Sequence, residues 1–151
     1  MRLLIQVASN AKVEVDSQII GSIDYGYVVF LGVCDEDNED IADKMLSKLL
    51  KLRIMPDDNG KTNMSILDKN GSLLIVSQFT LYADMTHGNR PNFLKAGAPD
   101  HANRIYEYFV SRAREEGMNV ATGQFGADMK VSLTNEGPFT IHMDSDEIIK
   151  K

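Results

Sequence analysis

The stretch YVVFLGV, residues 27–33, is an unbroken apolar run in the first third of the chain. A run of this length between polar or glycine-containing segments is typical of a β-strand that is covered on both faces. Residues 72–78, SLLIVSQ, form a second apolar run that finishes in polar side chains. We therefore expect a buried strand at each of these two runs.

Shorter strand signals surround these runs. Residues 3–5 (LLI), 13–15 (VEV) and 18–20 (QII) are separated by polar or glycine-containing segments that predict turns. Because the spacings are short, we expect antiparallel neighbours. Residues 129–133 alternate between apolar and polar side chains, which predicts a half-buried strand that leads into residues 135–138 and then a last short strand.

A first helix is predicted after the acidic segment DEDNED, residues 35–40. Its apolar residues recur at helical spacing, at Ile41, Met45, Leu49 and Leu52. The carboxylates of DEDNED then complement the helix N-terminus, and a metal site is the other reading of this segment. Residues 55–60, MPDDNG, predict a turn that ends the helix.

A second helix is predicted over residues 99–116, closed by Gly117. Its apolar side consists of Ala102, Ile105, Tyr106, Phe109, Val110 and Ala113. Strands therefore come first, and helices are interspersed without a regular alternation, which is typical of the α+β class. We expect a curved, mainly antiparallel sheet or small barrel covered by two helices, in a single domain of residues 1–151.

The sequence of 151 residues also indicates where in the cell the protein is expected, because it lacks features of membrane and secreted proteins. No stretch approaches the roughly 20 apolar residues of a membrane span, and the N-terminal MRLLIQVASN has no basic region before a long apolar block. One cysteine, Cys34, rules out an internal disulfide and is read as a passive strand-end residue rather than a catalytic thiol. We expect a soluble, cytoplasmic protein with no membrane partner.

The net charge of −6 argues against a protein that coats nucleic acid non-specifically, because such binding requires many cations that neutralise phosphates. DNA is not an expected partner. A nucleic-acid ligand is compatible with this charge if only one end is held through a few local cations.

Familiar catalytic patterns are missing. His87, His101 and His142 lie far apart and lack partners at zinc-ligand spacing, so we predict no metal. A G-x-S-x-G elbow, a P-loop and a G-x-G-x-x-G motif are all absent from the sequence, and no cofactor is expected. Residues 123–126, GQFG, are read as tight turns rather than as a glycine loop for a ligand.

Two polar interruptions of strands remain. Residues 77–81, SQFTL, end the second apolar run, where hydroxyl, amide and backbone N–H groups can converge on a ligand or simply form a polar turn. Residues 135–140, NEGPFT, place Gly-Pro within a strand pattern; proline cannot donate to a sheet ladder, and a plain hairpin turn is the simplest reading.

The segments SQFTLYAD and NEGPFTIHMDS resemble the two signature motifs of the D-aminoacyl-tRNA deacylases (D-tyrosyl-tRNA deacylase family), written SQFTL and N-x-G-P-V-T. GNRPNF follows the first motif and GQFGADMKVSLTN precedes the second, at similar spacing. The likeness extends from Met1 to Asp144. It implies a proofreading hydrolase that cleaves the ester of D-aminoacyl-tRNA, and also of mischarged glycyl-tRNA.

The resemblance also implies a homodimer with two equal sites. The Gly137–Pro138 bond would be cis, and the pair would enter the partner subunit's pocket to present backbone carbonyls to the substrate's α-amino group. An L-residue held by the same contacts would point its side chain into this backbone and be rejected.

For the chemistry, the resemblance points to Ser77, Gln78, Phe79 and Thr80. Backbone N–H groups near Phe79 and Thr80 would stabilise the tetrahedral oxyanion. Thr80 can be read as a nucleophile, but no base is evident, so attack by the ribose 2′-hydroxyl or by water is favoured, with Gln78 and Thr80 orienting the substrate.

Arg90 and Lys95 are candidate contacts to the tRNA acceptor end, the alternative being solvated or helix-capping charges. The chain departs from the family where Val7 replaces an arginine expected to help hold the Gly-Pro loop, and where Phe139, Ala83 and His87 replace valine, glycine and lysine. Two alternative functions stay open. One is an editing paralogue of relaxed specificity, and the other is a nucleic-acid-binding module without catalysis.

Overall fold

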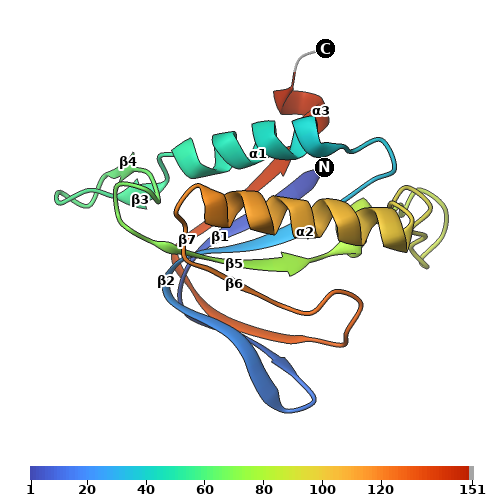
Figure 1. Cartoon of the computed structure of the whole chain (residues 1–151), viewed down its shortest axis with the longest axis horizontal. Coiled ribbons are helices and arrows are strands. Elements are labelled where there is room, and N and C mark those ends of the chain that lie inside the picture. Colours follow the sequence, from blue (N-terminus) through green and yellow to red (C-terminus); the bar gives the residue numbers. More distant parts are fainter. Residues whose placement is uncertain (150–151) are drawn as a thin grey trace.

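The computed structural model describes residues 1–149. Its main sheet has five strands in the order β6-β5-β2-β1-β7 (Figure 1). These strands are β1 (Arg2–Val15), β2 (Gln18–Gly32), β5 (Ser72–Ser77), β6 (Val120–Thr122) and β7 (Lys130–Asp144). The other elements are α1 (Glu39–Lys51), the two-stranded β3 (Met55–Pro56) and β4 (Thr62–Met64), the 3-10 turn η1 (Phe79–Tyr82), α2 (Pro99–Glu115) and α3 (Ser145–Ile148).

The predicted turn between residues 3–5 and 13–15 is wrong, because one long strand spans both segments, whereas the predicted turn between residues 13–15 and 18–20 is confirmed. Residues 3–5 and 13–15 both belong to β1, and residues 18–20 and 27–32 both belong to β2. Burial alternates on either side of the polar middle of β1 but not through it, since Val7 and Ala8 are both buried and Asn10 has a positive φ. The strand continues there through an irregularity in its pairing with β7. The hairpin turn lies only at Asp16 and Ser17, both with positive φ.

The sheet combines antiparallel and parallel pairing. β1 pairs antiparallel with β2, as the short spacing predicts, and it also pairs antiparallel with the distant β7 along most of its length. β5 pairs parallel with β2, and β6 pairs parallel with β5. α1 and the β3–β4 pair connect β2 to β5, and α2 connects β5 to β6, which gives each parallel pair the long crossover that it requires.

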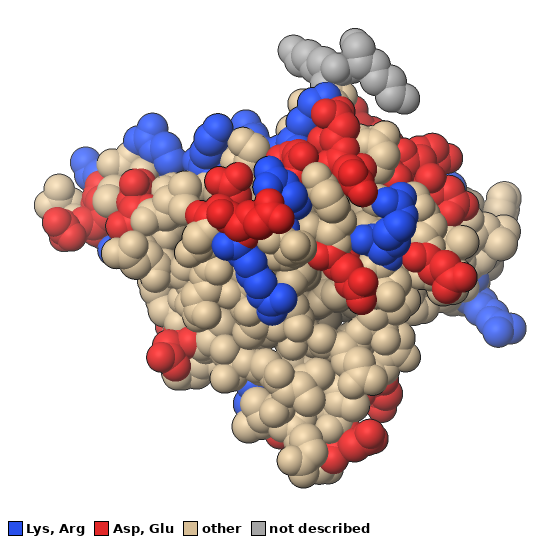
Figure 2. All heavy atoms as spheres, viewed as in Figure 1, with Lys and Arg blue, Asp and Glu red and all other residues tan. Residues whose placement is uncertain are grey.

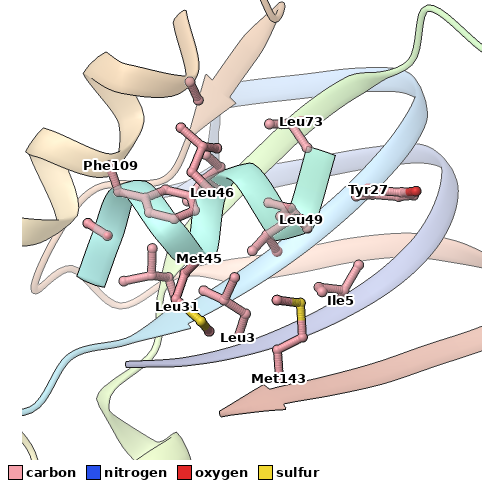
Figure 3. Packing of buried hydrophobic residues seen from close by; sticks show 14 of the residues in the cluster. Leu3, Ile5, Tyr27, Leu31, Met45, Leu46, Leu49, Leu73, Phe109 and Met143 are labelled. Carbon is pink, nitrogen blue, oxygen red and sulfur yellow. The ribbon is translucent and has the colours of Figure 1, made fainter. Parts of the chain in front are cut away.

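Both long helices cover one face of the sheet (Figure 1), and this confirms the predicted α+β architecture. Figure 3 shows the main core between these layers, where Met45 and Leu49 of α1 meet Leu3 of β1, and Phe109 of α2 lies in the same cluster. The side chain of Asn38 accepts a hydrogen bond from the N–H of Ile41, and Glu39 and Asp40 occupy the first turn of α1. The acidic segment thus starts a helix, as predicted.

A second apolar cluster lies on the strands themselves. Its buried members are Ala8, Ala11, Val13, Ile23, Val28, Leu74 and Val76, and Met129, Val131 and Leu133 pack against them. The sheet curls so tightly that a Cβ atom on Gly21 of β2 would lie 2.4 Å from the carbonyl oxygen of Thr122 in β6. This curl leaves an apolar cavity beside the end of β5. None of the described helices is long and apolar enough to cross a membrane.

Candidate active site

The SQFTL motif begins where β5 ends. The N–H of Gln78 donates to the carbonyl of Leu31 in β2 at 2.8 Å, and the chain then turns through η1. The turn is closed by hydrogen bonds from the N–H of Leu81 to Gln78 and from the N–H of Ala83 to Thr80. Gly32 permits this arrangement, because a Cβ there would lie 3.0 Å from the Gln78 carbonyl oxygen. The motif is therefore a 3-10 turn packed directly on the sheet.

The N–H groups of Phe79 and Thr80 find no acceptor within residues 1–149, as expected for the first residues of a helical turn. The side-chain amide of Gln78 donates to the hydroxyl oxygen of Thr80. This amide is the only hydrogen-bond partner of that hydroxyl in the described chain. An amide cannot take up a proton, so Thr80 has no general base beside it.

A cleft of about 730 Å³ opens beside this turn. Its walls come from the end of β5, the loop before α2, the first turn of α2 and the loop before β7. Ser77, Gln78 and Phe79 line it, whereas Thr80 lies just outside the lining set. Most of the wall is apolar, and its polar side chains, Ser77 and Gln78, lie together at the end of β5.

Aromatic side chains form the rim of the cleft. The ring of Phe79 is 56% exposed and meets the ring of Phe93 edge to face, with centroids 5.0 Å apart. Leu94 beside it is 89% exposed. Exposed apolar groups at the mouth of a cavity are typical of a ligand site.

The loop of residues 84–92 flanks this rim. Paired backbone hydrogen bonds between Asp84 and Asn92 close it. The Asp84 carboxylate accepts hydrogen bonds from the hydroxyl and the N–H of Thr86 and pairs with Lys95 at 3.2 Å. These contacts, the Thr86 hydroxyl first, lower the pKa of Asp84 to about 2.

The two candidate tRNA contacts differ in their surroundings. Lys95 is engaged with Asp84, so its charge is largely offset. Arg90 is exposed, and no ion pair or hydrogen bond within residues 1–149 involves its side chain. Of the two, Arg90 is the cation that is free to meet a phosphate.

The NEGPFT motif is neither a hairpin turn nor a break between two strands. Gln6 of β1 pairs with Thr140 and Ala8 pairs with Asn135, so residues 136–139 bulge out of a continuous β7 opposite Val7. The Gly137–Pro138 peptide bond is cis, as the resemblance implies, and both residues are exposed. A bulge accommodates proline because its residues leave the hydrogen-bonded ladder.

Side-chain hydrogen bonds hold this bulge. The Asn135 amide donates to the carbonyls of Val7 and Phe139, both at 2.9 Å. The Ser9 hydroxyl donates to the Glu136 carboxylate at 2.6 Å. Position 7 therefore contributes through its backbone, and the loop is braced without the arginine that Val7 replaces.

The structure does not bring the two motifs together within one chain. No residue of 135–140 lines the cleft beside Ser77 and Gln78. Gly137 instead borders a separate hollow of about 350 Å³, together with Val7 and Tyr25. The loop thus projects outward, at a distance from its own chain's cleft.

Sequence reasoning missed several residues of this site. The cleft wall includes Phe93, Leu94, Phe125, Gly126 and Met129. The GQFG segment was the available signal: interpreted only as tight turns, it also supplies Phe125 and Gly126 to the wall. Gly126 has a positive φ, which explains its type.

Other reactive side chains stay outside the cleft. Burial raises the pKa of the Cys34 thiol, which disfavours a thiolate. His87 and His142 are exposed and His101 is half-buried, and none of them lines the cleft. Within residues 1–149, no three His, Cys, Asp or Glu side chains are grouped to hold a metal ion.

Charge is distributed unevenly over the surface. On the face in Figure 2, lysine, arginine, aspartate and glutamate gather over the helices, whereas the part below α2, over the strands, carries fewer of them, mostly along its edges. Depletion of charge is typical of the centre of a protein interface.

Known proteins with related sequences cover almost the whole chain. A family model described as D-Tyr-tRNA(Tyr) deacylase matches residues 4–144. The D-aminoacyl-tRNA deacylase of Bacillus pumilus (strain SAFR-032) is 54% identical over 147 residues, which are 97% of this chain and 100% of that protein. The D-aminoacyl-tRNA deacylase of Thermus aquaticus is 52% identical over 147 residues, 97% of each chain.

Two solved structures share the fold over almost the whole chain. The protein named c-Myc DNA Unwinding Element Binding Protein superposes with a TM-score of 0.90 at 34% identity, over 95% of this chain and 98% of its own. A probable eukaryotic D-amino acid tRNA deacylase superposes with a TM-score of 0.83 over 94% and 97%; at 18% identity it shows the fold alone. The chain therefore belongs to the D-Tyr-tRNA(Tyr) deacylase family.

Proposed function

We propose that this chain hydrolyses the ester of D-aminoacyl-tRNA, and of mischarged glycyl-tRNA, as a cytoplasmic single-domain homodimer. The observation that carries the proposal is the pairing of an apolar cleft beside free N–H groups with a braced Gly137–Pro138 loop that faces away from it. Each cleft then receives the loop of the other subunit. The charge-poor surface over the strands supports such an interface (Figure 2).

The cleft receives the aminoacyl-adenosine end of the tRNA. Its volume of about 730 Å³ lies in the range of small-molecule sites. Phe79 and Phe93 at the rim offer aromatic surfaces for the terminal base, since unstacked bases bind to such rings. Arg90 contributes a contact to the phosphates that follow, and Lys95 contributes less because Asp84 holds it.

The reaction passes through a tetrahedral oxyanion at the ester carbonyl. The N–H groups of Phe79 and Thr80 donate to this oxygen, and two preorganised donors of this kind are the usual device for acyl transfer. The attacking oxygen is the ribose 2′-hydroxyl or water, because among residues 1–149 the Thr80 hydroxyl is hydrogen-bonded only to the Gln78 amide. Gln78 and Thr80 orient the substrate, and Ser77 completes the polar wall.

Chirality is read by main chain. The carbonyls of the partner's Gly137 and Pro138 accept hydrogen bonds from the substrate's α-amino group, which fixes the Cα substituents. A D-residue then directs its side chain away from the loop, and an L-residue directs it into the loop. The hydrogen bonds of Asn135 and Ser9 support this role, since a filter that excludes by shape must resist displacement.

The first test offers the purified protein D-tyrosyl-tRNA, L-tyrosyl-tRNA and glycyl-tRNA in parallel. We expect fast release of D-tyrosine and glycine and slow release of L-tyrosine. Comparable rates for D- and L-tyrosine would instead identify an editing paralogue of relaxed specificity.

The second test asks whether the two motifs act across subunits. Phe79→Pro removes a proposed oxyanion donor, and Pro138→Arg places a large cation where the α-amino group binds. Each variant alone is expected to be inactive. After mixing and subunit exchange, half of the dimers are mixed and one of their two sites is intact, so about one quarter of the wild-type activity returns. A mixture that stays inactive argues against the cross-subunit site.

A second candidate is a nucleic-acid-binding module without catalysis. The name of one solved relative, c-Myc DNA Unwinding Element Binding Protein, favours it. The net charge of −6 opposes it. A binder without turnover would retain many nucleic acids, DNA included, with an affinity that falls steeply as salt is added, whereas the hydrolase releases D-amino acids catalytically.

A further inference from the structure

Arg2, at the start of β1, reaches the turn that carries the SQFTL motif. One guanidinium nitrogen donates to the carbonyl oxygen of Leu81 at 2.9 Å. A second nitrogen donates to the carboxylate of Asp144 at 2.8 Å. The guanidinium carbon also lies 4.5 Å from the centroid of the Tyr82 ring. We propose that Arg2 is a positioning residue for the deacylation reaction, an inference that rests on the proposed function.

The contact to Leu81 fixes the far end of the turn. At its near end, the N–H of Gln78 is bonded to Leu31 of β2, which joins the turn to the sheet. The carbonyl of Leu81 has no backbone donor among the described residues, because the turn's own hydrogen bonds use the carbonyls of Gln78 and Thr80. Arg2 supplies that donor, so the turn is held at both ends.

The other two contacts hold Arg2 itself. Burial opposes ionisation of Asp144, yet the N–H of Asp146 and the Arg2 guanidinium keep the pKa of Asp144 below its ordinary value. The carboxylate thus stays charged at neutral pH and anchors Arg2. The buried ring of Tyr82 supports the flat face of the guanidinium. β1, β7 and the turn are joined through one side chain.

The attachment of the SQFTL turn at both ends matters because the proposed oxyanion donors lie between these ends. Phe79 and Thr80, whose N–H groups are to meet the oxyanion, are enclosed by Gln78 on one side and Leu81 on the other. An oxyanion donor acts only when it is held in place before the charge develops. Arg2 does not touch the cleft, since it is absent from the cleft wall, and it acts through the turn.

Arginine is required at this position by geometry. Two acceptors on different elements and an aromatic face are met at once by a planar group with several fixed donors. A lysine retains the charge and can donate to one of the two acceptors, so Arg2→Lys keeps part of these contacts. Arg2→Gln loses the charge and the stacking.

The test compares Arg2→Gln and Arg2→Lys with a control, Arg112→Gln. Arg112 lies on α2, pairs with Asp43 at 2.9 Å and does not line the cleft, so the control removes a similar ion-paired arginine elsewhere. With D-tyrosyl-tRNA we expect kcat to fall about 10- to 100-fold in Arg2→Gln and less in Arg2→Lys, with KM changed less than about twofold. Arg112→Gln retains the wild-type kcat.

Three results would overturn the proposal: a kcat for Arg2→Gln equal to that of the control, a loss confined to KM, or a loss in proportion to the unfolded fraction seen by circular dichroism. If Arg2→Gln fails to fold, Arg2→Lys carries the comparison. The amide NMR signals of Phe79 and Thr80 give a readout that needs no substrate. If the contacts of Arg2 with Leu81 and Asp144 position the turn, these amide signals shift in the Arg2 variants and not in Arg112→Gln. A wild-type protein inactive on D-tyrosyl-tRNA would refute the proposed function, while these signals still decide whether Arg2 sets the turn.

Discussion

The SQFTL turn and the NEGPFT loop are both polar interruptions of strand sequence, but the fold holds them by opposite means. The turn lies on the sheet, with Gly32 beneath it and Arg2 at its far end. The loop bulges from the edge strand β7 into solvent and depends on side-chain hydrogen bonds from Asn135 and Ser9. The turn is fixed against the sheet by packing together with hydrogen bonds at both of its ends, whereas the exposed loop depends on a small polar network.

This difference separates two kinds of mutational effect. Changes in the turn move groups that are proposed to meet the oxyanion, so they should lower the rate for every substrate. Changes in the loop move groups that are proposed to exclude L-residues, so they should alter the ratio between substrates. Substitutions in each motif, each with a matched control, can show whether rate and selectivity divide in this way.

The largest effect is expected from Phe79→Pro. Proline fits the first position of a helical turn, and Gln78 before it (φ −143°, ψ 82°) lies outside the α region that a following proline disfavours. The substitution therefore removes one N–H with little change in backbone. Phe79→Ala is the control, because it removes the ring contact with Phe93 and keeps the N–H. Single-turnover deacylation of D-tyrosyl-tRNA should be about 100-fold slower for the proline variant than for the alanine variant. Equal rates would remove the Phe79 N–H from the mechanism.

Asn135→Ala should affect selectivity more than rate. It leaves the carbonyls of Val7 and Phe139 without their donor, which costs about 1–3 kcal/mol of stability. The loosened loop admits L-tyrosine, and we expect the ratio of L- to D-hydrolysis to rise about 10-fold, a change of about 1.4 kcal/mol in discrimination. Thr134→Ala, at the exposed neighbouring position, is the control for both chemical denaturation and the paired assay. Unchanged discrimination in a destabilised Asn135→Ala protein would show that the loop needs no brace.

Gly137→Ala is a smaller test of the same loop. Gly137 has φ +117°, and an added Cβ would lie 3.0 Å from the N atom of Phe139. Gly117 has φ +86° with nothing within 4 Å, so Gly117→Ala isolates the cost of the backbone conformation. We expect about 1 kcal/mol for Gly117→Ala and about 1 kcal/mol more for Gly137→Ala, measured by urea unfolding. Equal losses would mean that Phe139 moves aside at no cost.

The sequence predicted the parts of the fold that depend on local periodicity. Both long helices, the two central strands and the polar turn after β5 follow from apolar spacing and from helix signals such as the acidic segment of residues 35–40 and Gly117. The length of the first strands was not predicted correctly. Polar residues in the middle of β1 suggested a turn, yet Ala8 and Ala11 on either side of them are buried, and the segment stays paired with β2 as one strand.

For the candidate site, too, local patterns were recognised and contacts between distant parts of the chain were not. Ser77 to Thr80 and Gly137–Pro138 were recognised because they carry a motif, that is, a local pattern. Arg2 donates a hydrogen bond to the carbonyl of Leu81, 79 positions away, and Asn135 donates one to the carbonyl of Val7, 128 positions away. No local sequence pattern could predict either contact. The wall residues Phe93 and Phe125 are brought together only by the loops around α2.

The loop of residues 84–92 offers the smallest test, since it belongs to neither motif but supports the rim beside Phe93. The pKa of Asp84 is about 2, below its ordinary value of 3.8. A lowered native pKa means that the contacts of Asp84 stabilise the loop above about pH 4, and that this contribution is lost as the pH falls from about 4 to about 2. The amide NMR shift of Thr86, which donates to Asp84, should therefore titrate with a midpoint near 2. Asp84→Asn should abolish that titration, whereas Asp16→Asn, the same change at the distant hairpin turn, should leave it intact. A midpoint near 3.8 would mean that Thr86 and Lys95 do not hold the carboxylate in solution, and that the loop depends on the backbone hydrogen bonds between Asp84 and Asn92 alone.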